Sequence, residues 1–138
     1  MRHPPYHLRS SKSVDRYLFV EILKRVLDHG KRPSSSYTYV GFGGPFLEDL
    51  KVVEHYFPDM KLISVEKDAE TVKRQIFHKF CRQVRLIHGT DEDFVANLKE
   101  GTRLALWFDF LGCAPKDIGT FSDAVRKAGE WSVLRITL

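Results

Sequence analysis

The chain alternates between short apolar runs and longer segments in which apolar residues recur every three or four positions. The short runs predict five strands, at residues 37–40, 61–65, 84–87, 103–108 and 131–138. The periodic segments predict helices over residues 13–30, from Pro45 to Phe57, around 72–80, around 94–98 and over 117–128. Residues 1–12 show no period and contain two prolines, so we expect an extended arm there, with Ser13 as the cap of the first helix.

The order of these elements predicts an α/β fold in which a doubly wound, mainly parallel sheet carries helices on both faces. The run at residues 103–108 is nearly all apolar, which is typical of a strand buried on both faces. Helical spacing places Val72 and Ile76 in one inward stripe, and Phe121 and Val125 in another. Ligands of such sheets bind at the carboxyl ends of the strands, so the residues that follow each strand are the candidates for a site.

Three glycines, Gly41, Gly43 and Gly44, follow the first strand in the stretch YTYVGFGGPFLEDL at residues 37–50. Glycine accepts positive φ angles and lets the backbone approach a ligand closely, and the helix that follows offers unpaired N–H groups. The pattern is typical of a loop that cradles a phosphate or a nucleotide. An ordinary strand–helix turn, with glycines that serve its geometry alone, is the alternative.

The residues around the glycines favour some ligands over others. Phe46 stands where a dinucleotide loop would carry its third glycine, and no lysine follows Gly44 as a Walker loop requires. Glu48 and Asp49 fall in the first turn of the next helix, where they complement the helix dipole but would repel a pyrophosphate. A ligand with an ammonium or sulfonium group would tolerate these carboxylates better.

Carboxylates follow the second, third and fourth predicted strands, as Glu66, Asp91 and Asp109. Because the carboxyl ends of parallel strands share one edge of the sheet, these side chains and the glycine loop should converge on one site. Each residue also has a simpler interpretation as a surface or strand-end acid. Helix capping would explain Asp91, or its neighbour Asp93, equally well.

The composition, with 43% hydrophobic and 29% charged residues in a chain of 138, is that of a soluble globular protein. The net charge of +4 permits an anionic partner, and the basic residues between 73 and 85 indicate a nucleic-acid footprint or, more often, the solvated face of a helix. Cys81 and Cys113 form no metal-type pair, which indicates reduced thiols in a cytoplasmic protein, and no apolar run reaches membrane-spanning length. Prolines separate His3 from His7, so we expect no metal site there.

Four short motifs, VGFGG, VEKD, GTDEDF and WFDFLG, together resemble those of class I S-adenosylmethionine-dependent methyltransferases. They match the glycine loop of that family, the acidic end of its second strand, the segment that flanks the adenine and the fourth-strand motif beside the methyl-transfer site. The N-terminal stretch YHLRSSKSVDRYLF also resembles that of a bacterial group of putative O-methyltransferases. The resemblance covers residues 37–112 well and implies a Rossmann-like fold with S-adenosyl-L-methionine as the cofactor.

The resemblance implies which residues would hold this cofactor. Glu66, followed by Lys67, would hold the ribose hydroxyls, and Asp91 would accept a hydrogen bond from the adenine amino group. The glycine loop would contribute four residues: Gly41, Phe42, Gly43 and Gly44.

The resemblance also implies a catalytic residue and a gate. Asp109 would lie beside the methyl-transfer site, where it could orient a nucleophile, accept a proton or stabilise the sulfonium. Methyl transfer is mainly a problem of positioning, so we expect few obligatory catalytic residues. Lys12, Asp15 and Arg16 of the N-terminal stretch would gate the cofactor.

Two features depart from the family pattern. The family carries an acidic residue two places before the first glycine of the loop, where this chain has Tyr39. Class I enzymes have seven strands, and this chain ends after the fifth predicted one, so we expect a truncated sheet and no turnover by the chain alone. The last strand would lie at an open edge and could pair with a second copy in a homodimer.

These features predict an enzyme that transfers a methyl group from S-adenosylmethionine to an oxygen or nitrogen acceptor of unknown identity. Residues 1–36 would form an N-terminal arm and helix, and residues 37–138 the Rossmann-like cofactor-binding core. One rival class is a non-catalytic module of the same fold that binds a partner or nucleic acid, which Tyr39 and the early end of the chain favour. The other is a nicotinamide-dependent oxidoreductase, which Phe46 disfavours.

Overall fold

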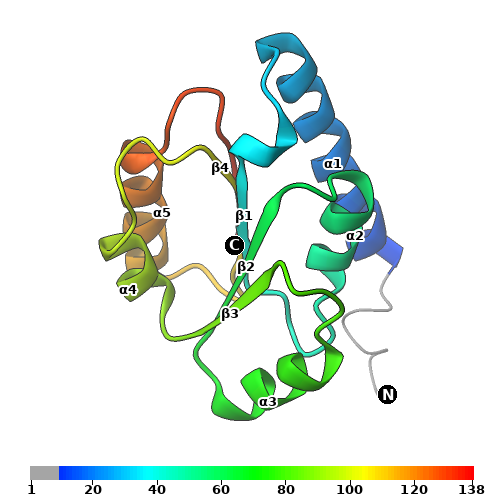
Figure 1. The fold of residues 1–138 in the computed structure, drawn as a ribbon. Coiled ribbons are helices and arrows are strands. Elements are labelled where there is room, and N and C mark those ends of the chain that lie inside the picture. The colour runs from blue at the N-terminus through cyan, green and yellow to red at the C-terminus, as the bar shows by residue number, and fades with distance from the viewer. Residues whose placement is uncertain (1–9) are drawn as a thin grey trace.

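The computed structural model describes residues 10–138, which form a five-stranded sheet between two layers of helices (Figure 1). The strands are the five that the sequence predicts: β1 (Thr38–Gly41), β2 (Lys61–Glu66), β3 (Val84–His88), β4 (Leu104–Asp109) and β5 (Val133–Thr137). The helices are α1 (Ser10–Gly30), α2 (Glu48–Tyr56), α3 (Ala69–His78), α4 (Asp91–Ala96) and α5 (Pro115–Lys127), with a short 3-10 turn, η2, at Ser34–Ser36.

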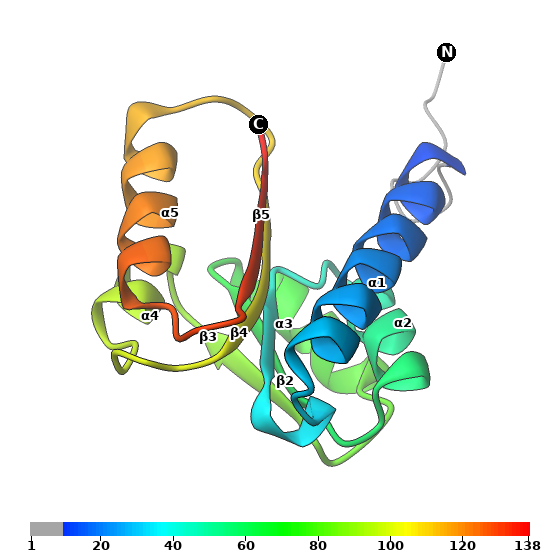
Figure 2. The same cartoon turned by 90° about the horizontal axis from the view of Figure 1, so that it is seen from above.

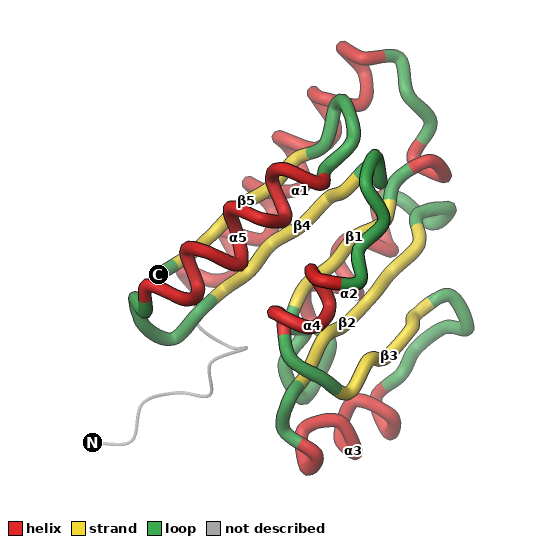
Figure 3. Tube along the Cα trace, turned by 90° about the vertical axis from the view of Figure 1, so that its left-hand side faces the viewer, coloured by secondary structure: helices red, strands yellow, loops and turns green. Residues whose placement is uncertain are grey.

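Every strand pair is parallel, and the strands lie in the order β3-β2-β1-β4-β5. Helices α1, α2 and α3 cover one face of the sheet, and α4 and α5 cover the other (Figures 1 and 2). From β3 the chain crosses to β4 on the other side of β1, so the strand order reverses between β1 and β4, and ligands of doubly wound sheets bind at such a switch point. The predicted α/β fold is confirmed, and β5 forms one edge of the described sheet (Figure 3).

Two apolar clusters hold the helices on the sheet. On one face, Phe19 and Leu23 of α1 are buried against β4, and the ring of Phe19 stacks on that of Trp107 at a centroid distance of 5.7 Å. On the other face, Val95 of α4 packs in one cluster with Leu106. All residues of β4 up to Phe108 are buried, as the apolar run predicts. Helix α1 thus shares a hydrophobic core with the strands that follow it.

Helix α1 begins at Ser10, so the prediction of an extended arm up to residue 12, with Ser13 as the cap, is wrong for residues 10–12. Lys12 pairs with Asp109 of β4, and Arg16, one turn later, pairs with Asp49 of α2. These ion pairs hold this end of the helix in place, and a hydrophobic pattern cannot reveal them. The other residues of the predicted arm, with His3 and His7, lie outside the described residues.

Helix α2 begins at Glu48 instead of Pro45. The chain first passes through a turn that ends at Leu47, whose side chain is fully buried and whose φ of 57° is left-handed. Burial of Leu47 in the core therefore decides where the helix starts, against the local signal of the proline.

No helix within residues 10–138 is long and apolar enough to span a membrane.

Helices α3 and α5 turn other residues toward the sheet than the spacing predicts. In α3, Gln75 is buried while Ile76 is 63% exposed. In α5, Thr120 and Ala124 are buried and Phe121 packs against the apolar cluster as predicted, while Val125 is 49% exposed. Thr120 and Ala124 thus form the buried face of α5, and the burial of Gln75 has its cause in the glycine loop.

Candidate active site

A cleft of about 680 Å³ opens at the carboxyl ends of β1 to β4. Its wall includes all but one of the predicted site residues: Phe42, Gly43, Gly44, Glu66, Lys67, Asp91 and Asp109. Gly41 is the exception, because it is buried at the end of β1, where a Cβ atom would lie 2.8 Å from the hydroxyl oxygen of Tyr39. Gly41 therefore serves the packing of β1 rather than a contact inside the cleft.

The glycine loop needs glycine at Gly43. The φ angle of this residue is +70°, and a Cβ atom would lie 2.7 Å from Ser64 Oγ and 2.9 Å from Leu47 Cδ2. Gly44 also has a positive φ, of +64°, although a Cβ there would meet no atom within 4 Å. The loop thus packs tightly on its inner side at Gly43 and is open at Gly44.

Gln75 of α3 clamps this loop. Its side-chain Nε2 donates hydrogen bonds to the carbonyl oxygens of Phe42 and Gly44, at 3.1 and 3.0 Å. Ser64 Oγ also donates to the Phe42 carbonyl, at 3.1 Å. These bonds fix the loop before any ligand arrives, and such preorganisation lowers the free-energy cost of binding.

Aromatic rings form an apolar part of the wall. The ring of Phe42 stacks on that of Phe108, with centroids 5.0 Å apart and an interplanar angle of 4°, and it meets Phe110 edge-on at 5.3 Å. Phe42 and Phe110 line the cleft, while Phe108 is buried behind them. The cleft therefore joins an apolar surface to the polar ends of the strands.

Glu66 and Asp91 offer carboxylate oxygens to the cleft. Glu66 Oε1 accepts a hydrogen bond from the Asp68 N–H at 2.9 Å, which orients the carboxylate at the end of β2. Asp91 Oδ2 is buried and has no hydrogen-bond partner within residues 10–138, and burial raises the pKa of this carboxyl group. Thr90 caps α4 by accepting from the Asp93 N–H at 3.1 Å, so capping does not explain Asp91, and Asp93 is exposed.

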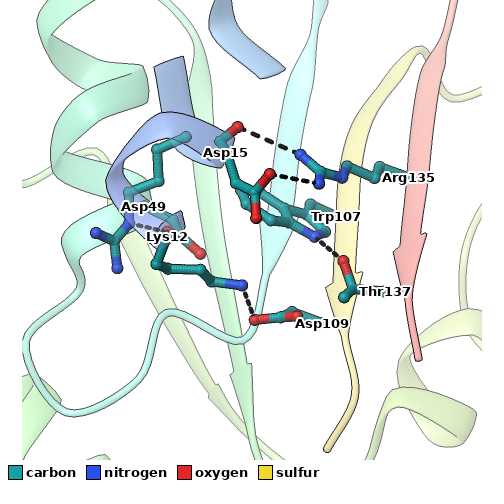
Figure 4. Close-up of polar contacts among 8 residues, drawn as sticks. Lys12, Asp15, Asp49, Trp107, Asp109, Arg135 and Thr137 are labelled. Atoms are coloured by element: carbon teal, nitrogen blue, oxygen red, sulfur yellow. Dashed lines mark hydrogen bonds and ion pairs between the residues drawn. The ribbon is translucent and has the colours of Figure 1, made fainter. Parts of the chain in front are cut away.

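Two ion pairs join α1 to the edge of the cleft (Figure 4). Lys12 Nζ contacts Asp109 Oδ2, and Arg16 Nε donates to Asp49 Oδ1 at 2.5 Å. Burial raises the pKa of Asp49, although the hydrogen bond and charge of Arg16 oppose that shift. Asp15 lies off the cleft wall, and its Oδ1 atom accepts a hydrogen bond from Nη2 of Arg135 in β5 at 3.0 Å.

Carboxylates outnumber cations along the cleft wall. The acidic lining residues are Glu48, Asp49, Glu66, Asp91, Asp109 and Asp117. The basic lining residues are Arg16, Lys67, Arg74 and Lys116. Such a wall suits a ligand that carries positive charge and disfavours a pyrophosphate.

A family model described as "Putative O-methyltransferase" matches residues 4–138. The chain belongs to this family. The resemblance seen in its motifs and in its N-terminal stretch is therefore confirmed. No curated protein sequence shows significant similarity to the chain.

Solved structures share the fold of this family member. A probable spermidine synthase from Corynebacterium glutamicum aligns with a TM-score of 0.65 and 15% identity, over 83% of this chain and 44% of that chain. A mutant of MtNAS in complex with S-adenosylmethionine aligns with a TM-score of 0.55 and 18% identity, over 84% and 44% of the two chains. A putative caffeoyl-CoA O-methyltransferase from Staphylococcus aureus aligns with a TM-score of 0.58 and 12% identity, over 85% of this chain and 55% of that chain. The chain thus spans about half the length of these proteins.

Sequence reasoning missed two residues of this site. Gln75 counts as a surface residue in any hydrophobic pattern, and only its hydrogen bonds to the loop explain its burial. Asp49 drew attention as a charge in the first turn of a helix, but its contact with Arg16 joins segments 33 positions apart. Of the predicted gate residues, Arg16 lines the cleft, Lys12 contacts a lining residue and Asp15 does neither.

Proposed function

We propose that this chain is the cofactor-binding part of a methyltransferase that uses S-adenosylmethionine to methylate an oxygen or nitrogen acceptor. One observation carries the proposal: in a member of this family, the glycine loop and three strand-end carboxylates, Glu66, Asp91 and Asp109, line the same cleft. The cofactor would supply a methyl group activated by a sulfonium.

The residues of the cleft fit this cofactor. Asp91 Oδ2 is a buried acceptor that lacks a donor among the described residues, which suits an adenine amino group. Glu66, fixed by the Asp68 N–H, would accept hydrogen bonds from the two ribose hydroxyls. Phe42 and Phe110 supply apolar surface, and the excess of carboxylates favours a cationic ligand.

Asp109 is the proposed catalytic residue. It ends β4 at the cleft wall, and the ion pair with Lys12 holds its carboxylate in place. From there it would orient the acceptor and take up the proton that the acceptor loses. The identity of the acceptor does not follow from these side chains, so we restrict its class to oxygen and nitrogen nucleophiles.

The cellular setting and the assembly are also proposals. Cys81 and Cys113 are both free thiols, which supports a cytoplasmic location. Strand β5 presents one edge of the described sheet, which supports a homodimer formed through that strand.

Calorimetric titration tests the proposed function. S-adenosylmethionine, S-adenosylhomocysteine and NAD are titrated in parallel into the protein, and we expect heat from the first two ligands alone. Phe46 at the position of a third loop glycine, and Glu48 and Asp49 at the start of α2, are the reasons to expect no heat from NAD. Binding of NAD alone would reject the proposed function and favour the alternative of a nicotinamide-dependent oxidoreductase.

A further inference from the structure

Helix α3 and the turn that follows it carry positive charge at the β3 edge of the sheet (Figures 1 and 3). The segment from Lys73 to Arg85 contains five basic residues and no acidic one. Four of its cations are exposed on α3 and the turn: Lys73, Arg74, Lys79 and Arg82. Glu70 pairs with Lys73 at 3.1 Å, but these side chains are 76% and 72% exposed, and surface pairs of this kind contribute little and open readily. The cations are therefore open to an anionic partner.

An exposed aromatic side chain lies among these cations. Phe77 is 84% exposed, in the same helix as Lys73 and Arg74. Solvation of a surface helix explains the cations alone, whereas cations with an exposed ring among them are the combination that binds a nucleic-acid strand. The four cations and Phe77 together make up the α3 surface.

Three rings lead from the α3 surface to the cleft. The ring of His78 meets that of Phe77 edge-on at a centroid distance of 5.1 Å, and it meets that of Phe46 at 4.9 Å. Phe46 and Arg74 both line the cleft. The α3 surface therefore borders the candidate active site, but it differs from the cleft wall in sign, because carboxylates outnumber cations along that wall.

We propose that the α3 surface binds single-stranded nucleic acid. The phosphates would lie against the four cations, and a base would stack on the exposed ring of Phe77. The bases of a duplex already stack on one another, so the exposed ring favours a single strand. The carboxylates of the cleft wall repel phosphates, which keeps the sugar–phosphate backbone on α3. The inference goes beyond the proposed function, because such binding needs no cofactor.

An anionic membrane surface is the rival partner, since helices that lie on membranes also combine cations with apolar side chains. Such helices insert a continuous apolar face. Among the large apolar residues of α3, only Ile76 and Phe77 are exposed, and the buried face of the helix is occupied by its contacts with β2 and β3. The small apolar area favours nucleic acid over a membrane.

Fluorescence anisotropy tests the proposal with labelled, unstructured strands of RNA and of DNA. The strands are about 12 nucleotides long, within the usual site sizes, and a duplex of the same length is measured beside them. We expect tighter binding of a single strand than of the duplex. Four phosphate contacts predict that the logarithm of the binding constant falls with the logarithm of the salt concentration at a slope of about −2.8. Binding of either strand supports the proposal, and the ratio of their affinities identifies the preferred sugar.

Substitutions separate the stacking from the charge. Phe77→Ala should weaken single-strand binding roughly 5- to 150-fold, whereas Phe77→Tyr, which keeps a ring, should stay within about twofold. Lys73→Gln with Lys79→Gln should lower the steepness of the salt dependence by about 1.4. The matched control is Arg25→Gln with Arg32→Gln, which removes two exposed cations on and after α1 and should keep the wild-type slope. Phe77, Lys73 and Lys79 are exposed and lie off the cleft wall, so their variants should keep the wild-type melting temperature and affinity for S-adenosylhomocysteine.

Each outcome decides for or against the α3 surface. Absence of binding to both strands, or an equal loss in the two charge variants, would overturn the proposal. Binding of the duplex as tightly as of the single strand, with no effect of Phe77→Ala, would reject the stacked base and the proposal with it. Adsorption to vesicles of phosphatidylcholine and phosphatidylserine, without binding of a strand, would assign the surface to a membrane instead. Calorimetry with S-adenosylhomocysteine tests the proposed function separately, so its failure would leave this proposal standing.

Discussion

Replacing Gln75 by leucine should weaken cofactor binding while leaving the stability of the fold nearly unchanged. The substitution removes the two hydrogen bonds that Nε2 donates to the loop carbonyls, each worth about 1 kcal/mol. It also removes Gln75 Oε1, a buried acceptor without a partner among the described residues, which costs roughly 1–3 kcal/mol in the wild type. The two effects offset each other, so we expect the free energy of unfolding to change by less than about 1 kcal/mol.

Loss of the two hydrogen bonds from Gln75 should make the glycine loop less ordered in the free protein. Both carbonyls keep other donors, since the Phe42 oxygen still accepts from Ser64 Oγ and from the Gly44 N–H at 2.7 Å, and the Gly44 oxygen from the Leu47 N–H at 3.4 Å. If one loop residue becomes ordered only when the ligand binds, the entropy cost of ordering it, about 1–2 kcal/mol, is subtracted from the binding free energy. The affinity then falls roughly five- to thirtyfold. Urea denaturation and calorimetry with S-adenosylhomocysteine measure the two quantities separately.

The neighbouring residue provides the control. Ile76 is the residue that helical spacing predicts as buried, but it is exposed, so Ile76→Ala should change the free energy of unfolding by less than about 0.5 kcal/mol. The reasoning is refuted if Gln75→Leu binds S-adenosylhomocysteine as tightly as the wild type. A larger destabilisation by Ile76→Ala than by Gln75→Leu would contradict the orientation of α3.

Three further perturbations test other parts of the site. Glu66→Ala removes the proposed ribose acceptor, so it should weaken S-adenosylhomocysteine by about 2–3 kcal/mol in calorimetry with little change in melting temperature; unchanged affinity would move the ribose contact elsewhere. Arg16→Gln removes a contact that lowers the pKa of Asp49, so NMR titration should find that pKa higher than in the wild type. Because the raised pKa of Asp49 gives stability that is lost as pH rises through the folded-state pKa, the variant should be destabilised more near neutral pH than in acid. For the proposed homodimer, sedimentation should show a mass that rises with concentration, and a monomer throughout would reject pairing through β5.

Local signals in the sequence locate most of the fold and the strand-end residues of the site. Apolar runs with β-branched residues mark the strands, and glycines or carboxylates mark the places where those strands end. Glu66, Asp91 and Asp109 could therefore be predicted to converge once the strands were taken as parallel, and all three line the cleft. Each of these residues directly follows its strand in the sequence, so its place at the end of the strand can be predicted from the chain alone.

Contacts between distant segments could not be predicted in the same way. Lys12 and Asp109 are 97 positions apart, and their ion pair extends α1 three residues beyond its expected start. Gln75 looks like a surface residue until the loop carbonyls, 31 and 33 positions earlier, are placed beside it. Leu47 adopts a left-handed φ because its side chain is buried, against the proline signal two residues before it. In each case, tertiary packing overrides the local preference.

The central claim is that S-adenosylmethionine binds in the cleft at the ends of β1 to β4. The most direct test is an amide NMR titration of the protein with S-adenosylhomocysteine. The claim predicts that the largest shift changes fall on Gly43, Gly44, Glu66 and Asp91, which line the cleft. Absence of shift changes at saturating ligand, or changes centred on the groove between α4 and α5 around Thr120 and Asp123, would contradict it.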